Sequence, residues 1–235
     1  MRVSVIIPTH NEAQSIERVL ADLPSALVAE VIVVDSNSSD GTPQIAARMG
    51  ARVLQEPRRG YGRACLTGLA AASSPDVVVF LDGDYSDRPA ELPILLAPLR
   101  EGRADITLGS RLQARRSTRA LPWHQAFGNR LAATMIRRLY GLQITDLGPF
   151  RAGRAEALQA LALQETTYGW AVEMILKGAL AGYRVVEVPV SYFPRIGKSK
   201  ISGTLKGTLG AGWFILSLIV RYYFRHPSRA GAGVG

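Results

Sequence analysis

The sequence predicts an α/β domain built on a mainly parallel, Rossmann-like sheet with helices on both faces. Through residues 1–110, short apolar segments rich in β-branched side chains alternate with segments of helical periodicity. This alternation is typical of parallel sheets, whose strands are buried on both sides. Polar residues gather after several of the apolar segments, and strand ends are where such sheets bind ligands. At 235 residues, the chain is long enough to bury a sizeable core.

The first half of the chain supplies strands and helices in strict alternation. The predicted strands are short and apolar, and they cover residues 3–8, 31–35, 52–55, 77–81 and 106–108. The predicted helices between them cover residues 13–23, 42–49, 62–72 and 89–100. No G-x-G-x-x-G pattern follows the first strand, so an ordinary dinucleotide-binding domain is disfavoured.

The second half of the chain is less regular. Its predicted helices are residues 123–140 and 168–181, and its predicted strands are residues 145–150 and 184–190. A basic loop follows the last strand at residues 192–200. We expect one continuous domain over residues 1–205. A basic and apolar helical extension with a frayed end is expected over residues 206–235.

The net charge of +9 is concentrated near the C-terminal end of the sequence. Glu187 is the last acidic residue, and seven basic residues follow it. Without these seven, 21 basic and 19 acidic residues leave a charge of only +2. The seven are Arg195, Lys198, Lys200, Lys206, Arg221, Arg225 and Arg229. A basic tail of this kind suggests nucleic acid, anionic lipid or a phosphorylated substrate as a partner.

The apolar run at residues 209–220 predicts contact with a membrane surface. As a helix it would be about 18 Å long, shorter than the roughly 30 Å hydrocarbon core of a bilayer. Trp213 and the Tyr and Arg residues that follow fit an interfacial helix, and an ordinary buried helix is the alternative. No secretory signal is evident, and the single cysteine, Cys65, is expected to be buried. We therefore expect a cytoplasmic protein, peripheral at the inner face of the cell membrane.

Three predicted strands end in polar clusters that should meet at one edge of the sheet. The first runs from Pro8 to Glu12 and the second from Asp35 to Thr42, where Ser39 or Asp40 could cap the following helix. The third is Asp82-Gly83-Asp84. Two carboxylates at this spacing can hold a divalent cation, which in turn can hold a diphosphate. Each cluster taken alone could be only a turn or a helix cap.

These motifs together resemble glycosyltransferase family 2, which has the GT-A fold. The resemblance rests on VSVIIPTHNEAQSI at residues 3–16, VIVVDSNSSDGT at 31–42 and VVVFLDGDYSD at 77–87. Four later motifs resemble the branch of dolichyl- or polyprenyl-phosphate sugar synthases. They are LGSR at 108–111, TDLGPFRA at 145–152, YGWAVEM at 168–174 and EVPVSYFPRIGKSKISGT at 187–204. The resemblance covers residues 3–205 in sequence order.

The resemblance implies which residues bind a nucleotide-sugar donor. Asp82 and Asp84 would position Mg²⁺ or Mn²⁺ on the diphosphate, and Arg111 would face the donor phosphates or sugar. Relatives often carry Gln two residues after the second Asp, where this chain has Ser86. The implied nucleotide-sugar residues besides Asp82 are Pro8, His10, Glu12, Asp35, Ser36 and Asp40.

The acceptor is expected to be a phosphate. A hydroxyl acceptor needs a base, and many relatives supply a late Glu-Asp pair, which residues 168–174 lack. A phosphate monoester is already ionised and needs cationic side chains instead. The expected acceptor residues are Arg151, Arg195, Lys198, Ser199, Lys200 and Ser202. The alternative is that these bases only solvate a loop. Glu173 could still act as a base or pair with an arginine, and Trp170 could be core or a platform for the sugar.

The predicted function is that of an inverting, metal-dependent glycosyltransferase. It would move a hexose from a donor of the GDP-mannose or UDP-glucose type to a polyprenyl or dolichyl phosphate. One alternative is the same fold acting on a soluble small-molecule acceptor. The other is a basic protein that binds nucleic acid or membrane on a degenerate transferase fold. The aromatic stripe of an RNA-binding sheet is absent, which disfavours the nucleic-acid reading.

Overall fold

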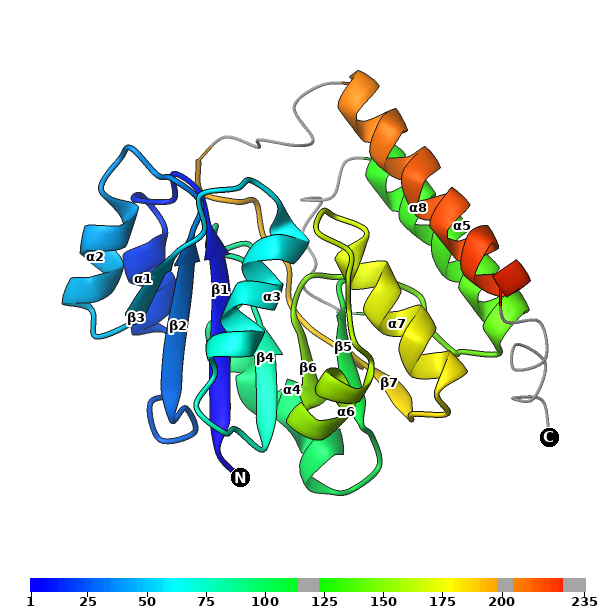
Figure 1. Ribbon diagram of the computed structural model, residues 1–235, viewed down its shortest axis with the longest axis horizontal. Coiled ribbons are helices and arrows are strands. Elements are labelled where there is room, and N and C mark those ends of the chain that lie inside the picture. Colours follow the sequence, from blue (N-terminus) through cyan, green and yellow to red (C-terminus); the bar gives the residue numbers. More distant parts are fainter. Residues whose placement is uncertain (114–122, 198–204, 226–235) are drawn as a thin grey trace.

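A seven-stranded sheet forms the centre of the molecule (Figure 1). The structure is a computed structural model that describes residues 1–113, 123–197 and 205–225. The strand order is β3-β2-β1-β4-β6-β5-β7. The strands are β1 (Val3–Thr9), β2 (Glu30–Asp35), β3 (Arg52–Gln55), β4 (Val77–Phe80), β5 (Ile106–Ser110), β6 (Arg151–Arg154) and β7 (Val185–Pro189). Only β6 runs against its neighbours, so the prediction of a mainly parallel sheet is confirmed.

Helices cover both faces of the sheet, as the alternating sequence pattern predicts. The helices are α1 (Ile16–Ala21), α2 (Thr42–Arg48), α3 (Tyr61–Ala71), α4 (Leu92–Arg100), α5 (Trp123–Tyr140), α6 (Ala155–Ala160), α7 (Trp170–Leu180) and α8 (Leu205–Arg225), with a 3₁₀ turn η1 (Pro89–Glu91). Successive β1 side chains enter opposite cores: Val5 and Ile7 face α1, α2 and α4, whereas Ile6 faces α3, α5 and α7. This alternation explains why the strands are apolar throughout.

The strand predicted over residues 145–150 is wrong. No strand forms there, and β6 begins at Arg151. The backbone N–H groups of Thr145 and Asp146 donate to the Glu187 carboxylate, and the Leu147 N–H donates to Asp146. Carboxylates therefore take the donors that a strand would use in a ladder. The short α6 was not predicted from the sequence.

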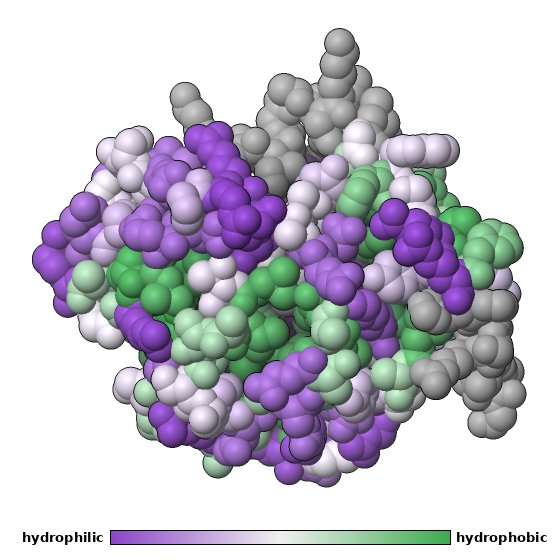
Figure 2. Space-filling view, viewed as in Figure 1, coloured by the Kyte–Doolittle hydropathy of each residue, from purple (hydrophilic) through white to green (hydrophobic). Residues whose placement is uncertain are grey.

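Helix α8 lies alongside α5 at the edge of the molecule far from β3 (Figure 1). Leu218 and Ile219 are buried, and the Tyr140 hydroxyl of α5 donates to the Ile219 carbonyl at 2.6 Å. On its other side, Trp213 is 76% exposed and Phe224 is 73% exposed. Figure 2 shows hydrophobic side chains at the edge where α8 lies. One face of α8 is thus part of the core, and the other face exposes large apolar side chains.

None of the helices within the described ranges is long and apolar enough to cross a membrane.

The strand directions gather the functional motifs at a single edge of the sheet. Strands β1, β2, β3, β4, β5 and β7 are parallel, so their carboxyl ends share this edge. Because β6 is antiparallel, the segment that precedes it, residues 145–150, reaches the same edge from the opposite direction. Six strand ends and residues 145–150 therefore meet at this edge, which we call the rim.

Candidate active site

The aspartate pair stands at the rim directly after β4. Asp84 is buried, and its Oδ1 accepts hydrogen bonds from the Ser86 backbone N–H and hydroxyl at 2.9 and 2.6 Å. Asp82 Oδ1 is buried with no hydrogen-bond partner among the described residues. Ser86 therefore holds the Asp84 carboxylate in place.

The electrostatics of this pair suit a divalent cation. Burial and the neighbouring Asp84 carboxylate raise the pKa of Asp82 to about 7. Two adjacent carboxylates with an unpartnered oxygen are stabilised when a cation lies between them. The described ranges contain no group of three or more His, Cys, Asp or Glu side chains placed to hold a metal. The residues thus fit a cation held by Asp82 and Asp84 and completed by oxygens from elsewhere.

The polar segments that follow β1 and β2 are hydrogen-bonded to each other at the rim. The Glu12 backbone N–H donates to the Thr42 hydroxyl at 2.8 Å, and the Ala13 N–H donates to Asp40 at 3.0 Å. Asp40 also accepts the Thr42 N–H at 3.1 Å, which supports the start of α2 as the sequence suggested. Burial opposes ionisation of Asp40, but these hydrogen bonds outweigh it and lower its pKa. The two strand ends therefore form one connected wall.

Asp35 is the centre of that wall. Its side chain is buried and accepts hydrogen bonds from the Thr9 hydroxyl at 3.2 Å and the Ser38 N–H at 2.9 Å. Ser36 is also buried, and its N–H donates to the Thr9 carbonyl. His10 lies beside these residues in the chain, and its Nδ1 is buried without a partner among the described residues. The nucleotide residues expected from the sequence thus occur together at the ends of β1 and β2, the two strands on one side of β4.

Arg195 reaches the rim from the loop after β7. Its Nη2 lies 3.2 Å from Glu12 Oε1, and its Nη1 lies 3.5 Å from Asp84 Oδ2. The loop is fixed there because the Phe193 and Ile196 N–H groups donate to the carbonyls of Ser86 and Asp84. The sequence assigned Arg195 to the acceptor, whereas the structure brings it to the carboxylates of the donor side. Lys198, Ser199, Lys200 and Ser202 lie outside the described residues.

Arg111 follows β5 and forms a two-pronged ion pair with Asp146. Its Nε and Nη2 donate to the two Asp146 oxygens, each at 2.8 Å. The guanidinium carbon also lies 4.9 Å from the centre of the Tyr192 ring. Arg111 is therefore held at the rim next to the loop that carries Arg195.

Arg151 and Glu173, which the sequence assigned to the site, are buried and form hydrogen bonds inside the protein. Arg151 is fully buried, and its guanidinium donates to the carbonyls of Ala171, Leu147, Gly148 and Pro149. Because backbone carbonyls inside the protein accept its hydrogen bonds, the Arg151 guanidinium is not available to an acceptor phosphate. We therefore do not keep Arg151 among the acceptor residues.

Glu173 is likewise buried and away from the aspartate pair. It accepts the N–H groups of Gln164 and Glu165, the Tyr222 hydroxyl at 2.9 Å and the Lys177 ammonium at 2.9 Å. These four donors occupy both oxygens, so the structure does not place Glu173 as a base at the rim.

Trp170 and Cys65 belong to the core. The Trp170 ring is fully buried and packs edge-on against Phe80 at a centroid distance of 4.6 Å. Of the two alternatives for Trp170, the core residue is the one observed. Cys65 is buried as expected, and burial raises the pKa of its thiol.

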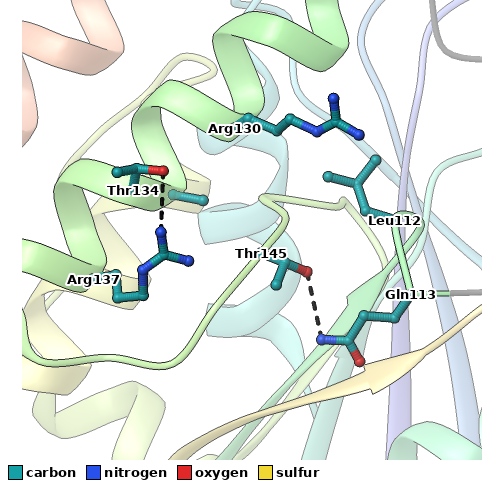
Figure 3. A pocket seen from close by; sticks show the side chains of 7 residues that line it. Leu112, Gln113, Arg130, Thr134, Arg137 and Thr145 are labelled. Atoms are coloured by element: carbon teal, nitrogen blue, oxygen red, sulfur yellow. Dashed lines mark hydrogen bonds between the residues drawn. The ribbon is translucent and has the colours of Figure 1, made fainter.

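A cationic pocket lies between α5 and the end of β5 (Figure 3). Its volume is about 360 Å³, and Arg130, Thr134 and Arg137 project toward it from α5. Gln113 and Thr145 close the other side, joined by a 3.4 Å hydrogen bond. No described carboxylate lies within 4 Å of the Arg130 or Arg137 guanidinium. The sequence predicted the helix but assigned no role to these residues. The available signal was the i, i+4, i+7 spacing of Arg130, Thr134 and Arg137, which places them on one side of the helix.

A parallel sheet with an aspartate pair and arginines at its carboxyl edge defines the class of nucleotide-sugar transferases with the GT-A fold. Solved structures agree with this fold. Glucosyl-3-phosphoglycerate synthase from Mycobacterium tuberculosis, in complex with Mn²⁺, UDP and phosphoglyceric acid, superposes with a TM-score of 0.75. The match covers 94% of this chain and 78% of that chain at 24% identity, which shows the fold alone.

The chain belongs to glycosyltransferase family 2. Its residues 4–162 match the model of Glycosyl transferase family 2. An uncharacterized glycosyltransferase of Mycobacterium tuberculosis is 41% identical over 88% of this chain and 93% of its own length. The undecaprenyl-phosphate mannosyltransferase of Micrococcus luteus is 35% identical over 88% of this chain and 90% of its own length. The resemblance predicted from the motifs is confirmed, and so is the prediction of a glycosyltransferase enzyme.

Proposed function

We propose that this enzyme moves a hexosyl group from a nucleoside diphosphate sugar to a polyprenyl phosphate, with inversion at the anomeric carbon. Three relatives support the acceptor class through their names. They are the Micrococcus luteus enzyme, a dolichyl-phosphate hexose transferase of Haloferax volcanii and a polyprenol monophosphomannose synthase of Mycolicibacterium smegmatis. The last two are 35% and 32% identical to this chain.

One structural observation carries the proposal. The rim holds the Asp82–Asp84 pair, with Asp84 buried, and the residues that follow Arg111 line a separate pocket. That pocket carries Arg130 and Arg137, and no described carboxylate lies within 4 Å of either guanidinium. A diphosphate needs a cation between itself and the aspartates, whereas a phosphate monoester needs only the arginines. The two places therefore suit the two anions of this reaction.

On the donor side, Asp82 and Asp84 would hold Mg²⁺ or Mn²⁺. Such a cation, when bound, stabilises the charge that develops on the departing nucleoside diphosphate. Arg195 lies 3.5 Å from Asp84, and the charge of Arg111 acts on Asp82, so both would add guanidinium donors to the same phosphates. Loss of one such contact typically costs on the order of 3 kcal/mol of barrier. Structural neighbours crystallised with Mn²⁺ or Mg²⁺ and UDP support this assignment.

On the acceptor side, Arg130 and Arg137 would hold the phosphate, with Thr134 as a hydroxyl donor. The phosphate oxygen is ionised near neutral pH and attacks the anomeric carbon without a general base. This agrees with the position of Glu173, whose oxygens are already occupied by four donors. No proton needs to leave the acceptor during transfer.

The exposed side of α5 and α8 supports a lipid acceptor and a peripheral position at the inner face of the membrane. We call Phe127 and Leu131 of α5, with Trp213, Val220 and Phe224 of α8, the apolar face; all five are exposed. Helices α5 and α8 contain Arg and Lys but no acidic residue. An apolar surface flanked by bases binds anionic bilayers through burial and charge together. Helix α5 thus carries both the phosphate pocket and part of the face that would meet the lipid.

A soluble phosphorylated acceptor is the second candidate. The favouring observation is the pocket itself, whose volume of about 360 Å³ would also hold a small phosphorylated compound. The solved glucosyl-3-phosphoglycerate synthase binds such a compound, phosphoglyceric acid. Family membership, in turn, favours either transferase over a protein that merely binds nucleic acid.

Transfer assays with purified full-length protein test the proposal. UDP- and GDP-sugars are offered with undecaprenyl phosphate in detergent, with phosphoglyceric acid, or with no acceptor, each with Mn²⁺, Mg²⁺ or EDTA. We expect a glycosylated lipid phosphate only in the presence of a divalent ion. Transfer to phosphoglyceric acid alone would establish the second candidate. Full activity in EDTA would overturn the role of the aspartate pair.

A further inference from the structure

The Asp146 carboxylate joins three segments of chain that the sequence keeps apart. Its two oxygens accept Arg111 Nε and Nη2 at 2.8 Å each, and Oδ2 also accepts the Arg111 backbone N–H at 2.8 Å. The Asn129 side-chain amide of α5 donates to Oδ1, as does the Leu147 N–H. The end of β5, the segment before β6 and helix α5 therefore meet on one side chain.

The Asp146 carboxylate is buried, and both of its oxygens accept hydrogen bonds. The Asp146 side chain is fully buried, and the Arg111 side chain is 12% exposed. A two-pronged pair fixes the plane of the guanidinium as well as its distance. The segment beneath it is fixed too, because Glu187 accepts the N–H groups of both Thr145 and Asp146. Neither partner can turn away without leaving a buried charge unpaired.

The neighbours of these three residues in the chain are the walls of the cationic pocket. Leu112 and Gln113 follow Arg111, Arg130 follows Asn129, and Thr145 precedes Asp146. A change in the junction would therefore move three sides of the pocket at once (Figure 3).

Arg111 also belongs to the donor side. Its positive charge acts on both Asp82 and Asp87, since it is among the groups that favour the ionised form of each carboxyl. Asp87 is buried, and neither of its oxygens has a hydrogen-bond partner within the described residues. If Asp146 were neutral, these carboxylates would compete for the guanidinium.

We propose that Asp146 is a positioning residue that sets the distance between donor and acceptor: it holds Arg111 at the aspartate pair and, through Asn129, holds α5 and the phosphate pocket against it. The proposal rests on the proposed function, because it takes the pocket as the acceptor site. Its physical basis is that two reactants held at a fixed distance react far faster than two that must find each other.

Two variants separate the halves of the junction. Asn129→Ala removes the link to α5 and leaves the Arg111–Asp146 pair, whereas Asp146→Asn keeps the shape and removes the charge that holds Arg111. Gln125→Ala, on the same helix and outside the pocket, is the matched control. We expect Asn129→Ala to raise the KM for undecaprenyl phosphate about tenfold or more, with the KM for the donor within twofold of wild type. Asp146→Asn should raise both.

Binding without turnover supplies the second measurement. Inorganic phosphate is titrated by calorimetry into the intact wild-type protein and each variant, with Arg130→Met as the pocket knockout. We expect Asn129→Ala and Asp146→Asn to weaken phosphate binding severalfold, while Mn²⁺–UDP binding to Asn129→Ala is unchanged.

The outcomes distinguish failure of the proposed function from failure of the positioning role of Asp146. If wild type and Arg130→Met bind phosphate equally, the pocket is not the acceptor site and the proposed function loses its support. If Arg130→Met abolishes binding but Asn129→Ala binds phosphate and uses acceptor like wild type, the positioning role alone is overturned. If Asn129→Ala weakens donor and acceptor binding equally, with a lower melting temperature, the junction is only structural and the proposal is overturned as well.

Discussion

Arg195 Nη1 lies 3.5 Å from Asp84 Oδ2, so a side chain of the protein itself stands where a cation would neutralise the aspartate pair. The same guanidinium reaches Glu12 at 3.2 Å, and its Nε is buried without a partner among the described residues. A cation arriving with the donor would compete with Arg195 for Asp84.

This competition leads to a prediction about metal binding. Arg195→Met should bind Mn²⁺ more tightly than wild type in the absence of nucleotide, by about fivefold, on the order of 1 kcal/mol for a partly exposed ion pair. Electron paramagnetic resonance measures the concentration of free Mn²⁺ during the titration. Arg88→Met is the control, because Arg88 packs on the Tyr85 and Phe193 rings in the same region. Equal affinities of wild type and Arg195→Met would show that Arg195 does not compete with the ion.

The aspartate pair should be indispensable for turnover but not for folding. Asp84→Asn should lower kcat by 10² to 10³, about 3–4 kcal/mol, because it removes a carboxylate that holds the leaving group's counter-ion. Its amide can still accept the Ser86 hydrogen bonds, so the melting temperature should change little. Glu101→Gln, an exposed carboxylate on the far side of α4, serves as the control. An active Asp84→Asn enzyme would remove the cation from the mechanism.

The apolar face should decide membrane binding. Trp213→Ser should weaken binding to phosphatidylglycerol vesicles by about tenfold or more, because burying a large apolar side chain contributes about 1.5–3 kcal/mol. Co-sedimentation measures the bound fraction, and binding should fall as salt rises. Ile94→Ser replaces an exposed apolar residue of α4 and should have no effect. If Trp213→Ser sediments with vesicles as wild type does, α8 does not meet the bilayer.

Glu173 should contribute to stability and not to chemistry. Burial opposes its ionisation, but hydrogen bonds from the Glu165 N–H, Lys177, the Gln164 N–H and Tyr222 outweigh burial and lower its pKa. Glu173→Gln should therefore lower the free energy of unfolding by about 1–3 kcal/mol at pH 7.

The pH dependence of that loss has a definite sign. Because the folded pKa is below the unfolded value of about 4.3, the carboxylate stabilises the protein above that pH. Its contribution is lost as the pH falls through the folded pKa. The urea-unfolding curves of wild type and Glu173→Gln should therefore converge in acid. Glu156→Gln on α6 should have the same free energy of unfolding as wild type at pH 7. A hundredfold fall in kcat for Glu173→Gln with unchanged stability would instead identify it as the base.

The fold and the donor side could be predicted because they are encoded locally. A run such as Val77–Phe80 is apolar enough to be a central strand, and the polar residues after it follow the strand wherever it ends. Parallel strands then bring Asp35, Asp82 and Asp84 to one edge with no further information. The family motifs added the chemical identity of that edge.

The acceptor side could not be predicted in the same way. Arg151 and Arg130 are both arginines in basic surroundings, yet one is fully buried on backbone carbonyls and the other is exposed on α5. The sequence predicted an acceptor role for Arg151 and no role for Arg130. Which way an arginine points depends on the neighbours that satisfy it, and those neighbours are distant in the chain.

By itself the sequence determined the alternating α/β order, the strand-end carboxylates, the basic, acid-free C-terminal stretch and membership of a transferase family. Only the tertiary structure decided that β6 reverses, so that Asp146 reaches the rim from the opposite direction and meets both Arg111 and Asn129. The reason is physical: strand propensity is a property of neighbouring residues, whereas the partner of a buried charge is chosen by packing across the whole fold.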